Sequence, residues 1–123
     1  MSDIIVTTPI AEHDHAKEEG EWIAAHPEDY WFRTLKNHAD VKVGDRIYYV
    51  DLGEITGYGV VFRITYGAMQ DSSTSGGVLW EGMNLCQKKW VWLKEPIPFK
   101  GFQGFRYVDR IEGLRARLKE SEK

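Results

Sequence analysis

The strongest constraint on the fold is a long run of β-forming residues that contains two closely spaced glycines. Residues 55–66 are rich in β-branched and aromatic side chains, which favour strands. Gly57 and Gly59 lie two positions apart within this run. Glycine weakens a strand unless a bend or a close neighbour needs the space, as happens at the corners of β-barrels. We therefore expect this strand to bend, or to pass beneath a large ring.

Other short segments have the same β-forming composition and are separated by turn residues. They predict strands over residues 4–8, 31–35, 46–50, 78–83, 88–94 and 105–108. Pro96 and Pro98 indicate a loop or an edge strand, because proline cannot donate to a ladder. The polar, serine-rich stretch 70–77 predicts a mobile loop.

Two helices are expected beside these strands. The first begins near Pro9 and ends near Ala25, with its acidic residues concentrated early, and we expect Trp22 to be buried against the barrel. The last helix follows Asp109 and Glu112, which have the spacing of a capping box. Its apolar stripe consists of Ile111, Leu114 and Leu118. The fold class predicted is α+β, a barrel or half-barrel of about six strands with flanking helices.

Length and composition indicate one globular domain. The chain has 123 residues, of which 42% are hydrophobic, so a single core is feasible. We divide it into residues 1–30 (strand and acidic helix), 31–108 (barrel) and 109–123 (last helix). Cys86 is the only cysteine, which excludes an internal disulfide and suggests a reducing compartment. We expect a cytoplasmic protein without a membrane span or a cofactor, and the oligomeric state stays open.

Charge is unevenly distributed along the chain. Residues 1–30 hold one lysine and eight acidic residues, a net charge of −7. Residues 31–123 hold fifteen basic and eleven acidic residues, a net charge of +4. The body of the domain is therefore mildly basic although the whole chain carries −3. The acidic segment is either a solvated helix face or a limit on non-specific nucleic-acid binding.

The common catalytic and metal-binding patterns are not met. His13 and His15 are two positions apart, so on a helix they point in different directions and cannot hold one metal ion. Gly57 and Gly59 lie within a strand pattern and lack the third glycine and helix of a phosphate-binding loop. Cys86 has no local catalytic signature, and we expect it to be buried. We assign no metal ligand and no primary catalytic residue.

Aromatic residues interleaved with basic residues are the remaining signal. Bases stack on aromatic rings for roughly 1–3 kcal/mol each, and Lys or Arg neutralises phosphate. The candidate ligand-binding residues are Trp31, Arg33, Thr34, Lys36, Trp90, Lys100, Gln103 and Arg106. In a β-barrel many of these rings can equally belong to the core.

Two segments resemble a known family. Residues 41–50 contain the turn Val43-Gly44-Asp45 and an aromatic strand, and residues 53–61 continue with the pattern I-x-G-x-G-x-V. This resembles the central hairpin of ASCH and EVE domains, which belong to the PUA-like superfamily together with YTH domains. Residues 96–105 combine prolines, the pattern KG-x-QG and an aromatic residue, and resemble the ending of ASCH domains.

The resemblance implies a PUA-like open barrel with a cleft between the first helix, the segment after it and the barrel mouth. Members of the superfamily bind RNA or single-stranded nucleic acid, read a modified base or, in one small group, deacylate acetylated cytidine. The leading hypothesis is therefore a non-enzymatic module for RNA or a nucleobase. Its first wall is formed by Trp31, Arg33, Thr34 and Lys36, and its second by Lys100, Gln103 and Arg106.

Two alternatives stay open. The amidohydrolase group uses a Lys-Thr-x-Thr segment with a distant Glu, whereas this chain has Arg33-Thr34-Leu35-Lys36 with Glu54 or Glu81 downstream. The order differs, so the activity is not transferred, and a hydrolase acting on a modified nucleoside with Lys36 and Glu81 as its reactive pair remains the first alternative. The modified-cytosine reading of EVE domains is not transferred either. A protein-interaction domain without a nucleic-acid ligand is the second alternative.

Overall fold

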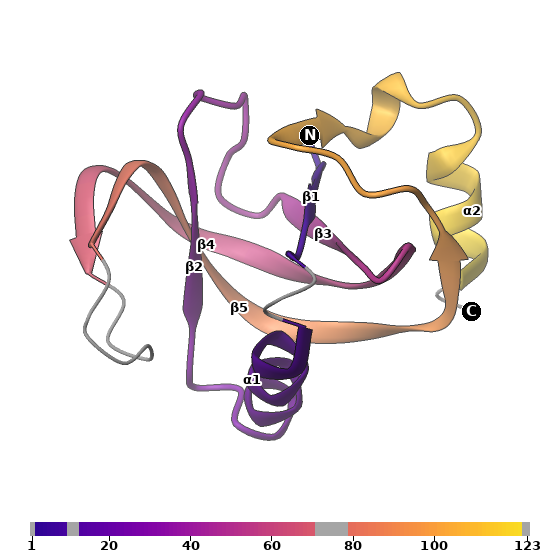
Figure 1. Cartoon of the computed structure of the whole chain (residues 1–123), viewed down its shortest axis with the longest axis horizontal. Coiled ribbons are helices and arrows are strands. Elements are labelled where there is room, and N and C mark those ends of the chain that lie inside the picture. The colour runs from indigo at the N-terminus through magenta and orange to yellow at the C-terminus, as the bar shows by residue number, and fades with distance from the viewer. Residues whose placement is uncertain (1, 10–12, 71–78, 122–123) are drawn as a thin grey trace.

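The computed structural model describes residues 2–9, 13–70 and 79–121. Figure 1 shows a curled sheet with a helix at each of two sides. Along the chain the elements are β1 (Ile4–Thr7), α1 (His13–Ala25), β2 (Trp31–Leu35), β3 (Arg46–Asp51), β4 (Glu54–Gln70), β5 (Leu79–Pro98), β6 (Phe105–Tyr107), a 3₁₀ turn η2 (Val108–Arg110) and α2 (Leu114–Ser121). The serine-rich loop expected over 70–77 lies outside the described residues, except for Gln70 at the end of β4.

The six strands form one mixed sheet in the order β2-β5-β4-β3-β1-β6. β1 pairs in parallel with β3 and antiparallel with β6. The other neighbours are antiparallel, and β4 and β5 form the longest ladder. In Figure 1 the sheet bends around its own concave face, with α1 beneath β5 and α2 beside the far end of β5. The predicted α+β fold with a six-stranded half-barrel is confirmed at this level.

Each face of the sheet carries its own core because successive side chains of a strand point to opposite faces. Ile47 and Tyr49 of β3 belong to the first core, together with Trp31 and Trp90 at its margin. Tyr48 of β3 belongs to the second core. α2 covers this second core with the buried Leu114 and Leu118, as the predicted apolar stripe requires.

The prediction of two strands over 78–83 and 88–94 is wrong, because both belong to the single strand β5. The linking residues 84–87 are buried and pair with β2 on one side and β4 on the other. Asn84 and Gln87 place polar side chains in this buried stretch. In the fold their amides are satisfied by hydrogen bonds to Thr65 and Tyr49, so polar side chains do not interrupt the strand.

The predicted capping box of the last helix is also wrong. Gly113 adopts φ +76°, a left-handed conformation that separates η2 from α2. Asp109 therefore lies in η2 and accepts a hydrogen bond from Arg115 Nε at 2.9 Å instead of capping α2.

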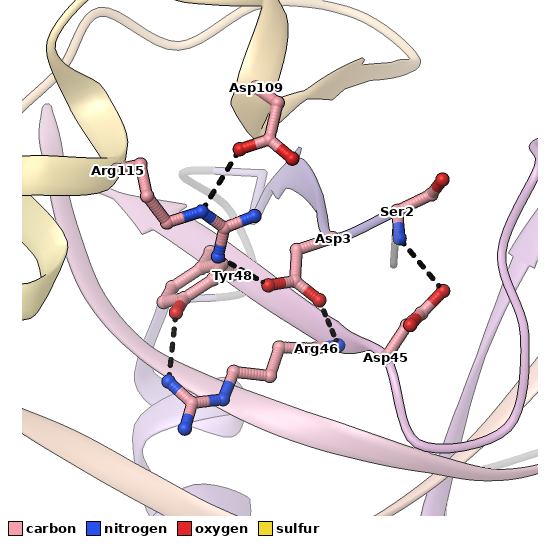
Figure 2. Close-up of polar contacts among 7 residues, drawn as sticks. All are labelled: Ser2, Asp3, Asp45, Arg46, Tyr48, Asp109 and Arg115. Atoms are coloured by element: carbon pink, nitrogen blue, oxygen red, sulfur yellow. Dashed lines mark hydrogen bonds and ion pairs between the residues drawn. The ribbon is translucent and has the colours of Figure 1, made fainter.

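A polar network joins α2 to the start of the chain (Figure 2). The Asp3 carboxylate is almost fully buried and accepts hydrogen bonds from Arg115 Nη1 at 2.6 Å and from the Arg46 backbone N–H at 2.7 Å. Arg115 reaches Asp109 with its Nε, as Figure 2 shows. We call Asp3, Arg46, Asp109 and Arg115 the Asp3 network.

The expectation that Trp22 is buried is wrong, since its side chain is 56% exposed. Trp22 instead stacks on His26 with ring centroids 3.7 Å apart, and its indole donates to Asp29 Oδ2. The neighbouring Ile23 is the residue that α1 buries. At 100° per residue, adjacent helix positions point in clearly different directions, so one position decides between core and surface.

Candidate functional site

Four aromatic residues gather where α1 lies against β5. Trp90 is in edge-to-face contact with Trp31, Tyr49 and Trp92, with ring centroids 5.9, 5.4 and 5.1 Å away. We call these four residues the aromatic cluster. Trp92 is 40% exposed, Trp31 and Trp90 are half-buried, and Tyr49 is buried. The cluster thus extends from the core to the surface.

Glycines make room for these rings, as the spacing of Gly57 and Gly59 predicted. A Cβ on Gly57 would lie 2.6 Å from Cζ2 of Trp90, and one on Gly59 would overlap the six-membered ring of Trp31. On the other side of Trp90, a Cβ on Gly20 of α1 would lie 3.0 Å from the indole nitrogen. Trp90 is therefore held between α1 and β4.

A β-bulge in β5 sets the direction of Trp90. Tyr58 and Val60 of β4 pair with Val91 and Lys88, so β5 contains one extra residue at this point. Within that bulge Lys89 adopts φ +60°, a left-handed conformation that costs a non-glycine residue roughly 1–2 kcal/mol. Bulges re-aim side chains, and they are frequent next to functional sites.

A chain of hydrogen bonds crosses the cluster. The Trp31 indole donates to the Tyr49 hydroxyl at 3.0 Å, and this hydroxyl donates to Gln87 Oε1 at 2.8 Å. Burial raises the pKa of the Tyr49 phenol, and the Glu19 carboxylate adds to this rise, against the opposing effect of the nearby Arg33 guanidinium and these two hydrogen bonds. Tyr49 is therefore a neutral donor at physiological pH, and the chain fixes the orientation of Trp31.

One polar atom of the cluster has no partner. The Trp90 indole nitrogen is buried and finds no hydrogen-bond acceptor in the part of the chain that the structure describes. An unsatisfied buried donor costs about 1–3 kcal/mol. The cluster therefore contains one donor that an additional acceptor would satisfy.

Arg33 supplies the positive charge beside the rings. Its half-buried guanidinium donates from Nη2 to the Thr7 carbonyl at 3.3 Å and influences the ionisation of Tyr49. Within residues 2–9, 13–70 and 79–121 it has no carboxylate partner. The Phe102 N–H donates to the Thr7 hydroxyl, so the loop after β5 meets Arg33 at the same residue. The end of β1 thus links parts of the two predicted walls.

The remaining predicted ligand residues lie apart from this centre. Thr34 donates to Asn84 Oδ1 at 2.6 Å, and strand alternation directs it away from Trp31 and Arg33. Arg106 covers the Phe102 ring at 4.4 Å on the side of the second core. The other three, all exposed, are Lys36, Lys100 and Gln103. The structure therefore brings together Trp31, Arg33 and Trp90 and leaves the other five outside the cluster.

Sequence reasoning missed Tyr49 and Gln87. Tyr49 lies in a segment that looks like ordinary strand interior, and Gln87 lies between the strands predicted over 78–83 and 88–94, directly before Lys88. Their role follows from register, because Gln87 pairs with Trp31 across β2 and β5. Trp92 lies two positions after Trp90, and its ring contact with Trp90 makes it the exposed member of the cluster.

The other candidate catalytic or metal-binding residues do not form a reactive site among the described residues. Lys36 and Glu81 are both exposed, and no hydrogen bond or ion pair between them occurs among the described contacts. Cys86 is fully buried, as expected. His13 Nδ1 lies 2.6 Å from Asp51 Oδ2, which links α1 to the end of β3. The described residues contain no group of three or more His, Cys, Asp or Glu side chains suited to a metal ion.

No helix in the described ranges is long and apolar enough to cross a bilayer. Comparisons with protein-family models, curated proteins and solved structures find no match for this chain. The functional inference therefore starts from the geometry of the aromatic cluster and Arg33.

Proposed function

We propose that the chain is a non-enzymatic module that binds RNA or a nucleobase, with the base received at the aromatic cluster. The observation that carries this proposal is the half-buried Arg33 guanidinium, which influences the ionisation of Tyr49 in the cluster and forms no ion pair with a carboxylate of the described residues. A half-buried charge without a counter-ion is costly for a protein to keep unless a ligand uses it. Phosphate is a ligand that matches the guanidinium in charge and geometry.

The aromatic residues fit the other part of such a ligand. Trp92 retains exposed ring area, and Trp31 is held in place by its bond to Tyr49. Stacking of a base on such a ring contributes about 1–3 kcal/mol and tolerates different bases. The Trp90 indole N–H is buried against Gly20 of α1, so the contact offered to a base is the exposed ring area of Trp92. Rings and cation together match a nucleotide better than they match an apolar peptide.

The hydrolase alternative receives no support from this geometry. It requires a buried lysine beside a carboxylate, so that the pKa of the amine is depressed. Lys36 and Glu81 are exposed and not joined to each other. No specific observation favours this second function.

Binding of nucleosides, nucleoside monophosphates and a random-sequence ten-nucleotide RNA tests the proposal. We expect the ligands to raise the melting temperature and to change the tryptophan fluorescence, because ligands of the folded state stabilise it by RT ln(1 + [L]/Kd). Arg33→Gln should weaken monophosphate binding about tenfold or more, since a charge-assisted hydrogen bond contributes about 1.5–3 kcal/mol. Its free energy of unfolding should change by no more than about 1 kcal/mol.

The matched control is Arg117→Gln, which removes an exposed arginine from α2. It should leave both affinity and stability unchanged. A wild-type chain that binds none of these ligands would contradict the proposal and favour a protein-interaction domain. Full affinity in Arg33→Gln would remove Arg33 from the site.

A further inference from the structure

A second group of rings and cations lies on the opposite face of the sheet from the aromatic cluster. Tyr30 and Phe62 are in edge-to-face contact, with ring centroids 5.6 Å apart. The Arg63 guanidinium lies 5.7 Å from the Tyr30 centroid and 5.3 Å from the Phe62 centroid. The Lys88 ammonium lies 4.7 Å from the Phe62 centroid. We call these four residues the outer patch.

The register of the sheet ties the outer patch to the aromatic cluster. Lys88 follows Gln87, which belongs to the hydrogen-bond chain of the cluster, and Tyr30 precedes Trp31. Gln87 and Trp31 pair directly across β2 and β5. Successive strand residues point to opposite faces, so Lys88 is directed away from the cluster. The two groups therefore lie back to back where the pairing of β2 with β5 begins.

The outer patch has free ring area and free positive charge. Tyr30 is 49% exposed and Arg63 is exposed, whereas Phe62 and Lys88 are half-buried. Neither Arg63 nor Lys88 has an ion-pair partner among the residues that the structure describes. Their two charges are therefore available to an anionic partner, at a place where an aromatic ring is exposed as well.

This combination distinguishes between anionic partners. An acidic peptide would use the two cations but would gain little from the exposed face of Tyr30. A nucleotide uses both, because its base stacks on the ring and its phosphate lies against Arg or Lys. Charge complementarity together with ring exposure therefore favours single-stranded nucleic acid as the occupant.

We propose that the outer patch is a second contact site for single-stranded nucleic acid, which takes a nucleotide that flanks the base held at the aromatic cluster. This inference rests on the proposed function of that cluster. A single-stranded nucleic acid bound at both sites passes around the start of β2. There Tyr30 of the outer patch and Trp31 of the aromatic cluster are adjacent residues. The patch then adds affinity for an oligonucleotide and none for a mononucleotide.

The test compares two probes on the full chain, a random-sequence ten-nucleotide RNA and a nucleoside monophosphate. Tyr30→Ala should weaken oligonucleotide binding about tenfold, as expected for loss of one stacked base, and should leave monophosphate binding unchanged. Arg63→Gln combined with Lys88→Gln should lower the slope of log K against log salt by about 1.4, from about 0.7 per phosphate contact. Cross-linking of a 4-thiouridine RNA should label the peptide that contains Tyr30 or the one that contains Phe62.

The matched control is Tyr66→Ala, because Tyr66 is the most exposed tyrosine, at 64%, and contacts His38 rather than the patch. It should change neither affinity. Unchanged oligonucleotide affinity in Tyr30→Ala, with monophosphate binding intact in the wild type, would overturn the outer patch alone. Absence of binding to both probes by the wild type would overturn the patch and the proposed function together.

Discussion

At the scale of single residues, the aromatic cluster depends on a missing side chain at Gly59. A Cβ there would overlap the Trp31 ring and lie 2.8 Å from Gln87 Oε1. Gly59→Ala should therefore lower the free energy of unfolding by about 1–3 kcal/mol through overpacking. Urea denaturation followed by circular dichroism measures the change.

The same substitution in a Trp31→Ala background is the control for this prediction. Without the indole ring the added methyl group has space, so most of the cost should disappear in the double variant. An equal cost in both backgrounds would show that a neighbour other than Trp31 opposes the side chain.

At this scale the sequence predicted a bend or a covering ring at Gly57 and Gly59, but it did not predict that Trp22 is exposed. The spacing of Gly57 and Gly59 within a strong β run already required a bend or a ring, and both Trp90 and Trp31 are there. The exposure of Trp22 depends on how α1 is rotated about its axis against the sheet. That rotation is set by long-range packing, which a helical pattern alone does not determine.

At the scale of the elements, β5 contains backbone strain that a substitution can remove. Lys89 adopts φ +60° in the bulge that directs Trp90 into the cluster. Glycine adopts this conformation without steric cost, so Lys89→Gly should raise the free energy of unfolding by about 1 kcal/mol. Thermal and urea denaturation both measure the gain.

Lys88→Gly is the matched control, because Lys88 is the preceding residue of the same strand and pairs regularly with Val60. It should lower stability by about 0.5–1 kcal/mol through the higher backbone entropy of glycine. A loss of stability in Lys89→Gly as large as in Lys88→Gly would show that the bulge needs its lysine.

The positions of most elements followed from the sequence, but their continuity did not. β2 has the predicted bounds Trp31–Leu35, and β3 extends the prediction by one residue to Asp51. Two strands were predicted where β5 is one, and the buried amides of Asn84 and Gln87, which have hydrogen-bond partners, are compatible with a continuous strand. Bulges such as the one at Lys89 have no clear local signature, since they depend on the pairing strand.

At the scale of the whole molecule, the Asp3 network joins α2 to the first strand. Arg115 is the one side chain of the network that reaches both buried Asp3 and exposed Asp109. Arg115→Met removes a charge-assisted hydrogen bond from a buried carboxylate and should lower the free energy of unfolding by about 1.5–3 kcal/mol. Urea denaturation at pH 7 measures the loss.

Asp109→Asn is the control, because it removes only the exposed arm of the network. The hydrogen bond from Arg115 holds the pKa of Asp109 below its ordinary value of 3.8. A lowered pKa means that the fold favours the charged form of Asp109. The stabilisation from its bond to Arg115 is therefore fully present above pH 3.8, and it is lost as the pH falls through the lowered pKa. The variant should differ from wild type by less than about 1 kcal/mol at pH 7, and by less still at acidic pH. A loss equal to that of Arg115→Met would assign the stabilisation to Asp109 instead of Asp3.

The composition of the site could be predicted only in part, because the sheet order divides residues that are close in sequence. Trp31 and Arg33 lie on the face of β2 that packs on the first core, whereas Thr34 points to Asn84 on the other face. Arg106 is likewise separated by strand alternation in β6. A list of aromatic and basic residues contains no information on faces until the register of each strand is known.

The place of β1 between β3 and β6 has a consequence for synthesis. Its left and right neighbours, β3 and β6, come later in the chain, and β6 pairs with Ile4 only once Tyr107 has been made. The hydrogen bond from Arg115 to Asp3 forms later still, since the two residues are 112 positions apart. Contacts so distant in sequence are slow to form, and the loop between them must first be closed. During synthesis the apolar strand β1 therefore emerges from the ribosome before either of the strands that pair with it has been made.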